Sequence, residues 1–293
     1  MSLSTIQGAI ELGLIFAIMS VGIFISFRVL NIPDLTIDGT FTLGTSVSAI
    51  FAFHGMPVLG ILLSIVCGAL AGCVTGLLQT KLKIQPILAG ILTMTALYSV
   101  NLRVMGQKPN LSLFDKPSIF APLEKLFGDY GNLVLIAAIL LAVVAVLYWF
   151  LKTQLGMCLR ATGDNEDMVR ASSINSDAMK IMGLAVANAL VSLAGAVLAQ
   201  YQSFSDVGGG IGMMVIGLAS IIVGEAIFGR GSILRSFIAV AAGAVLYRFV
   251  LTLVLQAGLP SGDLKLFSAL LVTVAISIPV LKKAIVKRRN RRA

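Results

Sequence analysis

Apolar runs close to 20 residues long recur along the whole chain, and they restrict the possible folds more than any other feature. About 20 apolar residues form a helix long enough to cross the hydrocarbon core of a bilayer. Only 12% of the 293 residues are charged, about half of the share in a typical soluble domain. The sequence therefore predicts an all-α polytopic membrane protein, with a single transmembrane domain over 1–293.

We expect about eight or nine membrane spans in this domain. Their approximate limits are 8–29, 39–53, 58–79, 86–105, 132–151, 180–202, 212–228, 234–256 and 264–281. The run at 39–53 is short for a span, and if it is a half-helix that turns back, the side assigned to the N-terminus reverses.

Basic residues outnumber acidic ones, with 22 Lys and Arg against 13 Asp and Glu. Most of the basic residues lie between or after the apolar runs, and the chain ends in a basic tail at 282–293. In a membrane protein this distribution indicates the positive-inside rule and attraction to anionic headgroups. We therefore expect a lipid bilayer around the spans, a cytoplasmic C-terminus and no nucleic-acid partner.

Two ionisable residues lie inside the late apolar runs. Glu225 and Arg248 differ in expected depth by about 15 Å at 1.5 Å per residue, so they are poorly placed to pair. We expect Glu225 to lie near Arg230, Arg235 or a neighbouring helix instead.

A stripe of small residues marks the run at 58–79. Gly60, Ser64, Gly68, Gly72 and Gly76 place a small residue at every fourth position. On a helix this spacing lets another backbone approach closely, so it predicts helix packing. Lining of a solute pathway is the alternative interpretation.

The segment NIPDLTIDGT, residues 31–40, places two carboxylates between two apolar runs. Asp34 can cap the turn after Pro33, and Asp38 can cap the helix that follows, which would explain both acids structurally and keep them outside the hydrocarbon. The alternative is a broken-helix hinge at the inner mouth of a solute pathway. Its pathway or gate candidates are Asp34, Thr36, Asp38, Thr40 and Thr42.

Two parts of the chain show a faint similarity to each other. DGTFTLGTSVSAIF, a break and a Gly-rich run resemble GGGIGMMVIGLASIIVGEAIF, the break GRGS and SFIAVAAGAVLYRF. The two units would cross the membrane in opposite senses, as in the inverted repeats of many transporters.

The sequence carries no signature of an enzyme. The G-x-x-x-x-G-K-[ST] pattern of an ATP-binding loop does not occur. The GGGIG run at 208–212 is interpreted as a flexible outer turn that leads into a helix. The three cysteines and the single histidine have no metal-ligand spacing, so we expect no metal site.

The loop at about 152–179 is long and mixed in charge, unlike the other cytoplasmic connections. Thr162 or Asp164 could cap a short helix with Glu166 and Asp167 in its first turn, and a second helix could start at Asn175. The loop could be purely structural, or it could present a short helix for docking to a partner.

At this loop the sequence resembles a known family. Arg160-Ala161, Asp164-Asn165, Ala171 and Ile174-Asn175 are similar to the coupling segment of permeases from branched-chain amino-acid-type bacterial ABC importers. Ser173 stands where that segment usually has glycine. The similarity extends over nearly the whole chain, and PDLTIDGTF resembles most the single-permease subgroup that works with a tryptophan/tyrosine-type binding lipoprotein.

The resemblance implies a type II ABC importer permease fold with inverted-repeat helices in the bacterial inner membrane. It implies a second copy of the permease, an ABC ATPase subunit dimer and an extracytoplasmic substrate-binding lipoprotein as partners. The chain itself would hold no cofactor, because the ATPase binds Mg-ATP. A coupling helix over about 163–175 would contact the ATPase through Gly163, Asp164, Asn165, Glu166, Met168, Val169, Arg170, Ala171, Ile174 and Asn175.

The function that follows is ATP-driven import of a small solute, with an amino acid, and an aromatic one in particular, as the leading substrate. A stand-alone ion-coupled secondary transporter is the alternative. It would need ionisable groups at mid-depth in the spans, which the sequence offers sparingly.

Overall fold

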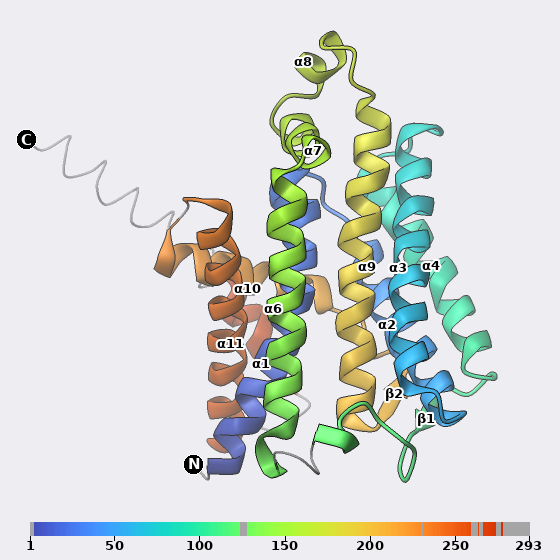
Figure 1. Cartoon of the computed structure of the whole chain (residues 1–293), viewed down its shortest axis with the longest axis vertical. Coiled ribbons are helices and arrows are strands. Elements are labelled where there is room, and N and C mark those ends of the chain that lie inside the picture. The colour runs from blue at the N-terminus through green and yellow to red at the C-terminus, as the bar shows by residue number, and fades with distance from the viewer. Residues whose placement is uncertain are drawn as a thin grey trace, which may run out of the picture.

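The computed structural model describes residues 3–123, 128–229, 231–258, 263, 266–273 and 277, which form a bundle of long helices (Figure 1). The longer helices are α1 (Leu3–Phe24), α2 (Thr36–Phe53), α3 (Pro57–Thr80), α4 (Pro86–Val104), α6 (Gly131–Lys152), α9 (Ser176–Gln202), α10 (Met213–Phe228) and α11 (Ile233–Gln256). The short elements are the π-helical turn η1 (Ile25–Val29), β1 (Asn110–Ser112), the 3-10 turn η2 (Gly128–Tyr130), α7 (Gln154–Asp164), α8 (Glu166–Ala171) and β2 (Phe204–Asp206).

The expected spans from 8–29 to 234–256 each correspond to one of these helices. Within the described residues, six helices are long and apolar enough to cross a membrane: α1 with η1, α3, α4, α6, α9 and α11. Helix α2 and the 16-residue α10 are not among these six. Half of the expected span at 264–281 and the whole basic tail at 282–293 lie outside the described residues.

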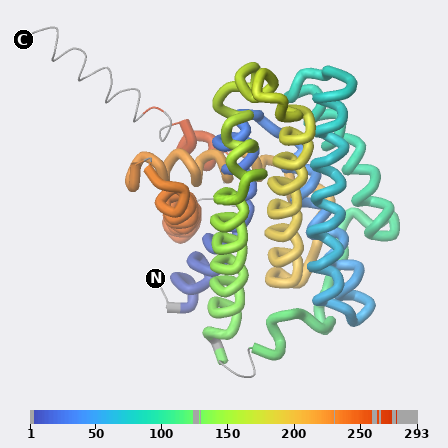
Figure 2. The backbone as a smooth tube through the Cα atoms, turned by 45° about the horizontal axis from the view of Figure 1, so that its top comes forward, coloured from blue at the N-terminus to red at the C-terminus, as the bar shows by residue number. Residues whose placement is uncertain are grey.

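Helix α9 is at the centre of the packing, beside α1, α2 and α3 (Figure 2). The stripe of small residues on α3 lies largely in the α3–α9 contact. A Cβ added at Gly68 would meet Asn188 O at 2.6 Å, and one at Gly76 would meet Ile181 Cα at 2.8 Å. Ser192 on α9 donates a hydrogen bond of 2.7 Å to the Ser64 carbonyl. The small side chains are therefore what lets these two backbones touch.

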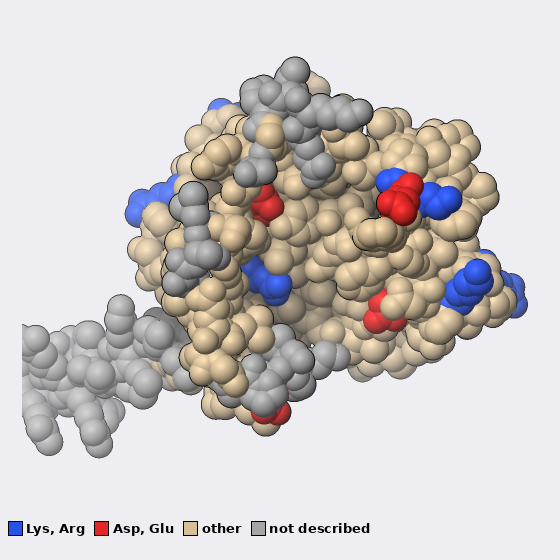
Figure 3. Space-filling model, turned by 90° about the horizontal axis from the view of Figure 1, so that it is seen from below, with Lys and Arg blue, Asp and Glu red and all other residues tan. Residues whose placement is uncertain are grey.

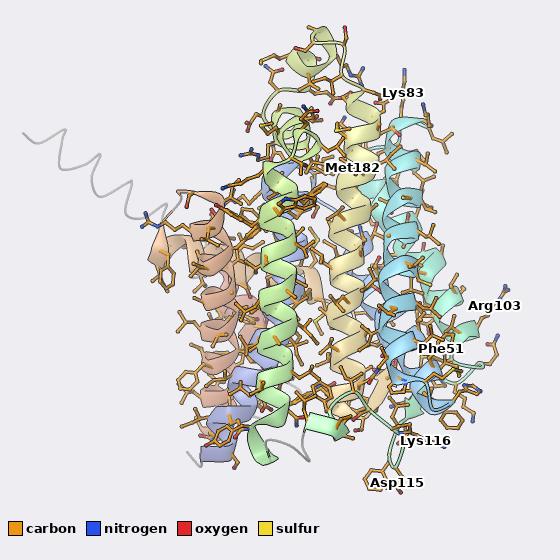
Figure 4. The ribbon with its side chains drawn as sticks, in the orientation of Figure 1. Phe51, Lys83, Arg103, Asp115, Lys116 and Met182 are labelled. Carbon is orange, nitrogen blue, oxygen red and sulfur yellow. The ribbon has the colours of Figure 1, made fainter. Side chains whose placement is uncertain are left out.

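The bundle has two distinct ends. At one end, here the loop end, lie α7 and α8 (Figure 1). At the other, here the ribbon end, β1 and β2 pair as a two-stranded antiparallel ribbon. Figure 4 shows Lys83 at the loop end and Arg103, Asp115 and Lys116 toward the ribbon end.

The loop after α6 contains two short helices, which differs from the single helix expected over about 163–175. Thr153 caps α7 by accepting the Gly156 N–H, and Asn165 ends α7 and caps α8 by accepting the Met168 N–H at 3.1 Å. The expected caps at Thr162 or Asp164 are therefore wrong. Asn175 caps α9 as predicted, by accepting the Ala178 N–H at 3.0 Å.

Candidate functional site

The break between η1 and α2 turns back into the bundle and buries Asp34, whose side chain is 1% exposed. Its Oδ1 accepts the Thr36 N–H at 2.9 Å, which is the predicted turn cap. Its Oδ2 accepts from Asn188 Nδ2 at 2.7 Å. Asn188 lies about 18 Å along α9 from Ser176, near the middle of that helix. The expectation that Asp34 stays outside the hydrocarbon depth therefore does not hold.

A chain of hydroxyl groups links the start of α2 to α3 and α4. The Thr36 and Thr75 hydroxyls lie 2.8 Å apart, and Thr75 donates to Thr93 at 3.0 Å. The Thr40 and Thr42 hydroxyls instead donate to backbone carbonyls one turn earlier in α2. Bonds of this kind satisfy a hydroxyl inside a helix, so the second pair has a structural partner already.

Asp38 caps a different helix from the one expected. Its carboxylate accepts the N–H groups of Gly212 and Met214, each at 2.9 Å, at the start of α10. A carboxylate is stabilised there by the free N–H groups and the helix dipole. The GGGIG run forms a turn, and its Gly210 packs inward against the Asp38 carbonyl and the Thr42 hydroxyl. It does lead into a helix, as predicted.

A cavity of about 170 Å³ adjoins this contact and is named here the α2–α4 cavity. Its lining includes Asp38, Thr42, Met94, Tyr98, Asn101 and Ile211. Asn101 Nδ2 donates to the Gly39 carbonyl at 3.2 Å, while the buried Asn101 Oδ1 has no partner in the described part of the chain. The cavity thus combines an apolar wall with a free acceptor, a pattern typical of small-molecule sites.

At the loop end, Glu166 holds α8 against the start of α9. Glu166 accepts from Lys180 Nζ at 2.6 Å and from Arg170 Nη2 at 2.8 Å. Arg170 also donates to Ser176 Oγ at 2.8 Å and pairs with Asp177 at 3.2 Å. The hydrogen bond from Lys180 is the main cause that lowers the pKa of the Glu166 carboxyl below its usual 4.5. Glu166 and Arg170, two of the expected contacts with the ATPase, thus already have partners within the loop.

The remaining coupling candidates divide into exposed and inward-facing residues. Met168 is 64% exposed, and Asp164, Asn165, Ala171 and Asn175 are exposed as well, while Ile174 is half-buried. Val169 is only 2% exposed, and Gly163 packs against the Val29 carbonyl. These two residues support the loop from inside and do not offer the apolar contact expected of Val169.

Ser173 has a left-handed backbone with φ of 62°. Glycine adopts this conformation without the steric cost that a Cβ introduces. The geometry explains why glycine is the usual residue at this position of the coupling segment, and it shows that serine keeps the turn.

Three acidic residues that help to position the site have partners that the sequence did not identify. Asn188 donates to Asp34. The sequence signalled a partner of this kind only through the presence of a carboxylate in the break between η1 and α2. Arg28 donates two hydrogen bonds to Glu225, at 2.8 and 2.5 Å, which joins η1 to α10. This confirms that Glu225 pairs with a neighbouring helix. Glu11, buried in α1, could have been found as an ionisable residue inside the first apolar run.

The fold and the comparisons with known proteins agree on the class of protein. A bundle of apolar helices with a broken, polar-lined helix start defines a multi-pass membrane transport protein. The family model described as branched-chain amino acid transport system / permease component matches residues 5–277. The chain belongs to this family and is a permease component of an ABC-type transport system, as the resemblance implied.

Three relatives illustrate the range of the similarity. The chain is 39% identical to a tyrosine transport system permease protein of Clostridioides difficile, over 92% of this chain and 90% of that protein. It is 32% identical to an uncharacterized protein, RP368, of Rickettsia prowazekii, over 92% and 95%. It is 25% identical to the ribose import permease protein RbsC of Haemophilus influenzae, over 84% and 73%. No solved structure shows significant similarity to the chain.

Proposed function

We propose that this chain forms the pathway of an ATP-driven importer that moves an amino acid, with an aromatic one as the leading candidate. The observation that carries the proposal is the α2–α4 cavity, where apolar and aromatic side chains surround the Asp38 carboxylate and the free Asn101 acceptor. The 39% identity to a tyrosine transport permease supports this substrate class. The more distant similarity to ribose permeases makes a sugar the competing substrate.

Within this proposal the pathway candidates have two roles. Asp38 and Thr42 line the α2–α4 cavity and would contact the solute. Asp34, Thr36 and Thr40 are buried behind it and would hold the start of α2 in place. The break would then act as a hinge whose polar groups exchange partners when the pathway opens.

The partners are assigned to the two ends of the bundle. The loop end, with the exposed Met168 and Ala171, would dock an ABC ATPase dimer that binds Mg-ATP, and this chain would bind no cofactor of its own. The ribbon end would receive a substrate-binding lipoprotein, and a second copy of the permease would complete the pathway. This arrangement puts the loop end and the C-terminus in the cytoplasm of a bacterial inner-membrane protein, consistent with the charge distribution.

Co-purification of the ATPase and solute-stimulated ATP hydrolysis in the reconstituted assembly test the proposal. Ala171→Arg is expected to abolish ATPase association with membrane insertion intact, because a long cation would replace a small exposed side chain of α8. Ala257→Arg, equally exposed but at the ribbon end of α11, is the matched control and should keep association. Solute uptake by this chain alone, driven by an ion gradient, would refute the importer.

The solute itself is tested separately. Mass spectrometry of the ligand that co-purifies with the cognate binding protein is expected to identify an aromatic amino acid. A sugar in that position would refute the substrate and leave the ATP-driven mechanism standing.

A further inference from the structure

A second cavity lies at the ribbon end, on a different part of the molecule from the α2–α4 cavity. It measures about 430 Å³ and is lined by residues of α1, η2, α6 and α9, among them Gln7, Gly8, Glu11, Asn132 and Tyr201. Figure 3 shows this end of the molecule, whose surface is hollowed. We name it the Glu11 cavity.

The Glu11 carboxylate is the feature that requires an explanation. The residue is only 4% exposed and lies about 12 Å along α1 from Leu3. It accepts hydrogen bonds from Gln7 Nε2 at 2.9 Å and from Tyr201 Oη at 2.8 Å. Among the residues that the structure describes, no cation forms an ion pair with it. An unpaired carboxylate inside a span is costly and marks a functional site by default.

Arg248 forms no ion pair with Glu11 among the described residues. Arg248 interacts electrostatically with Tyr201, but its guanidinium lies over the Phe16 ring, 5.4 Å from the centroid. Arg248 therefore stacks on an aromatic ring of α1 and leaves the carboxylate to the cavity.

The cavity has acceptors that can take further hydrogen bonds. Each Glu11 oxygen receives one hydrogen bond and can accept another. The buried Asn132 Oδ1 has no partner within the described ranges. Beside Gly8, an added Cβ would meet only Tyr201 Oη, at 3.9 Å, so the space next to the carboxylate is open. A ligand that fits must bring positive charge and several hydrogen-bond donors, which describes a primary ammonium group.

We propose that the Glu11 cavity binds the primary ammonium group of the solute at the ribbon end of the bundle. This inference rests on the proposed function, because an amino acid carries such a group whereas a simple sugar does not. Glu11 supplies the charge, Asn132 supplies a third acceptor, and the Tyr201 ring forms the wall. Burial strengthens this charge-assisted contact relative to the same contact in water.

The test measures ligand-induced thermal stabilisation of the purified chain in detergent. Tyramine, which has the amine without the carboxylate, is expected to raise the unfolding midpoint. 3-(4-hydroxyphenyl)propionate, which lacks the amine, is expected to have no effect. Ammonium chloride is compared with sodium chloride at equal ionic strength, and a shift as large as that given by tyramine would overturn the assignment to the solute.

Two variants and one control test whether tyramine binds at this cavity. Glu11→Gln keeps the shape and removes the charge, and should weaken tyramine binding by at least about tenfold. Asn132→Ala removes the free acceptor and should weaken it less, which provides a second test if Glu11→Gln does not fold. Asp206→Asn changes an acidic residue of β2 that does not line the cavity, and should bind tyramine as the wild type does. Wild-type affinity in both cavity variants would overturn the proposal.

The result also separates this inference from the proposed function. Amino-acid import that persists in the complete importer carrying Glu11→Gln, with unchanged affinity for the amine, would refute only the Glu11 cavity. Tyramine binding that depends on Glu11, in an importer that carries no amino acid, would refute only the proposed function.

Discussion

Replacing Asp38 by Asn tests the contact that joins the start of α2 to the start of α10. The carboxylate accepts two N–H groups at 2.9 Å, from Gly212 and Met214. Asn keeps one acceptor oxygen and turns an NH₂ group toward the other N–H. One charge-assisted bond and the interaction with the α10 dipole are lost, which should cost about 2 kcal/mol or more.

The loss is expected to be local, so hydrogen–deuterium exchange is the appropriate assay. A change of about 2 kcal/mol in the free energy of opening corresponds to roughly 30-fold faster exchange. The faster exchange should appear in peptides that cover 208–216, while peptides from α9 keep their rates. Asp167→Asn is the matched control, because this exposed acid lies on α8, outside 208–216. Unchanged exchange at 208–216 in Asp38→Asn would refute the capping argument.

Three further changes follow from the same reasoning. Ser173→Gly should stabilise the loop by about 0.5–1 kcal/mol by removing left-handed strain, whereas Ser172→Gly, at φ of −84°, should destabilise it. Limited proteolysis of the loop measures both effects. Gly72→Leu should prevent α3 from packing on α9 and lower the unfolding midpoint by several degrees, while Leu70→Ala at a 59% exposed position should not. The pKa of Glu166 is lowered in the folded protein. The ion pairs by which Glu166 holds α8 against α9 should therefore be fully formed above about pH 4.5 and weaken as the pH falls below that value. Hydrogen–deuterium exchange of α8, corrected for the pH dependence of the intrinsic exchange rate, measures this weakening. Protection of α8 that does not change with pH would contradict it.

Much of the helical framework could be predicted from the chain. Apolar runs near 20 residues identify α1, α3, α4, α6, α9 and α11, because a bilayer selects for that length. The spacing of Gly68, Gly72 and Gly76 predicted close packing of α3, and α9 is the helix that fills the groove. Both signals are local, since each depends only on residues within one helix.

The candidate site could be predicted only in part. The sequence indicated Asp34 and Asp38 as helix caps, and each carboxylate does accept helix N–H groups. It could not indicate that Asp38 caps α10, because that contact joins residues 174 positions apart. The depth of Asp34 was also missed, since the turn of the chain back toward Asn188 has no local signature.

The sequence by itself determined that the chain is a membrane-embedded helical permease. Hydrophobicity, helix length and small-residue spacing act within single segments, and the motif of the loop at 152–179 is continuous in the chain. Only the tertiary structure decided which polar groups meet. It paired Asp34 with Asn188 and Arg28 with Glu225, and it left Glu11 facing a cavity with no ion-pair partner among the residues that the structure describes. A buried polar group needs a partner wherever the fold can bring one, and that partner is set by how helices pack and not by distance along the chain.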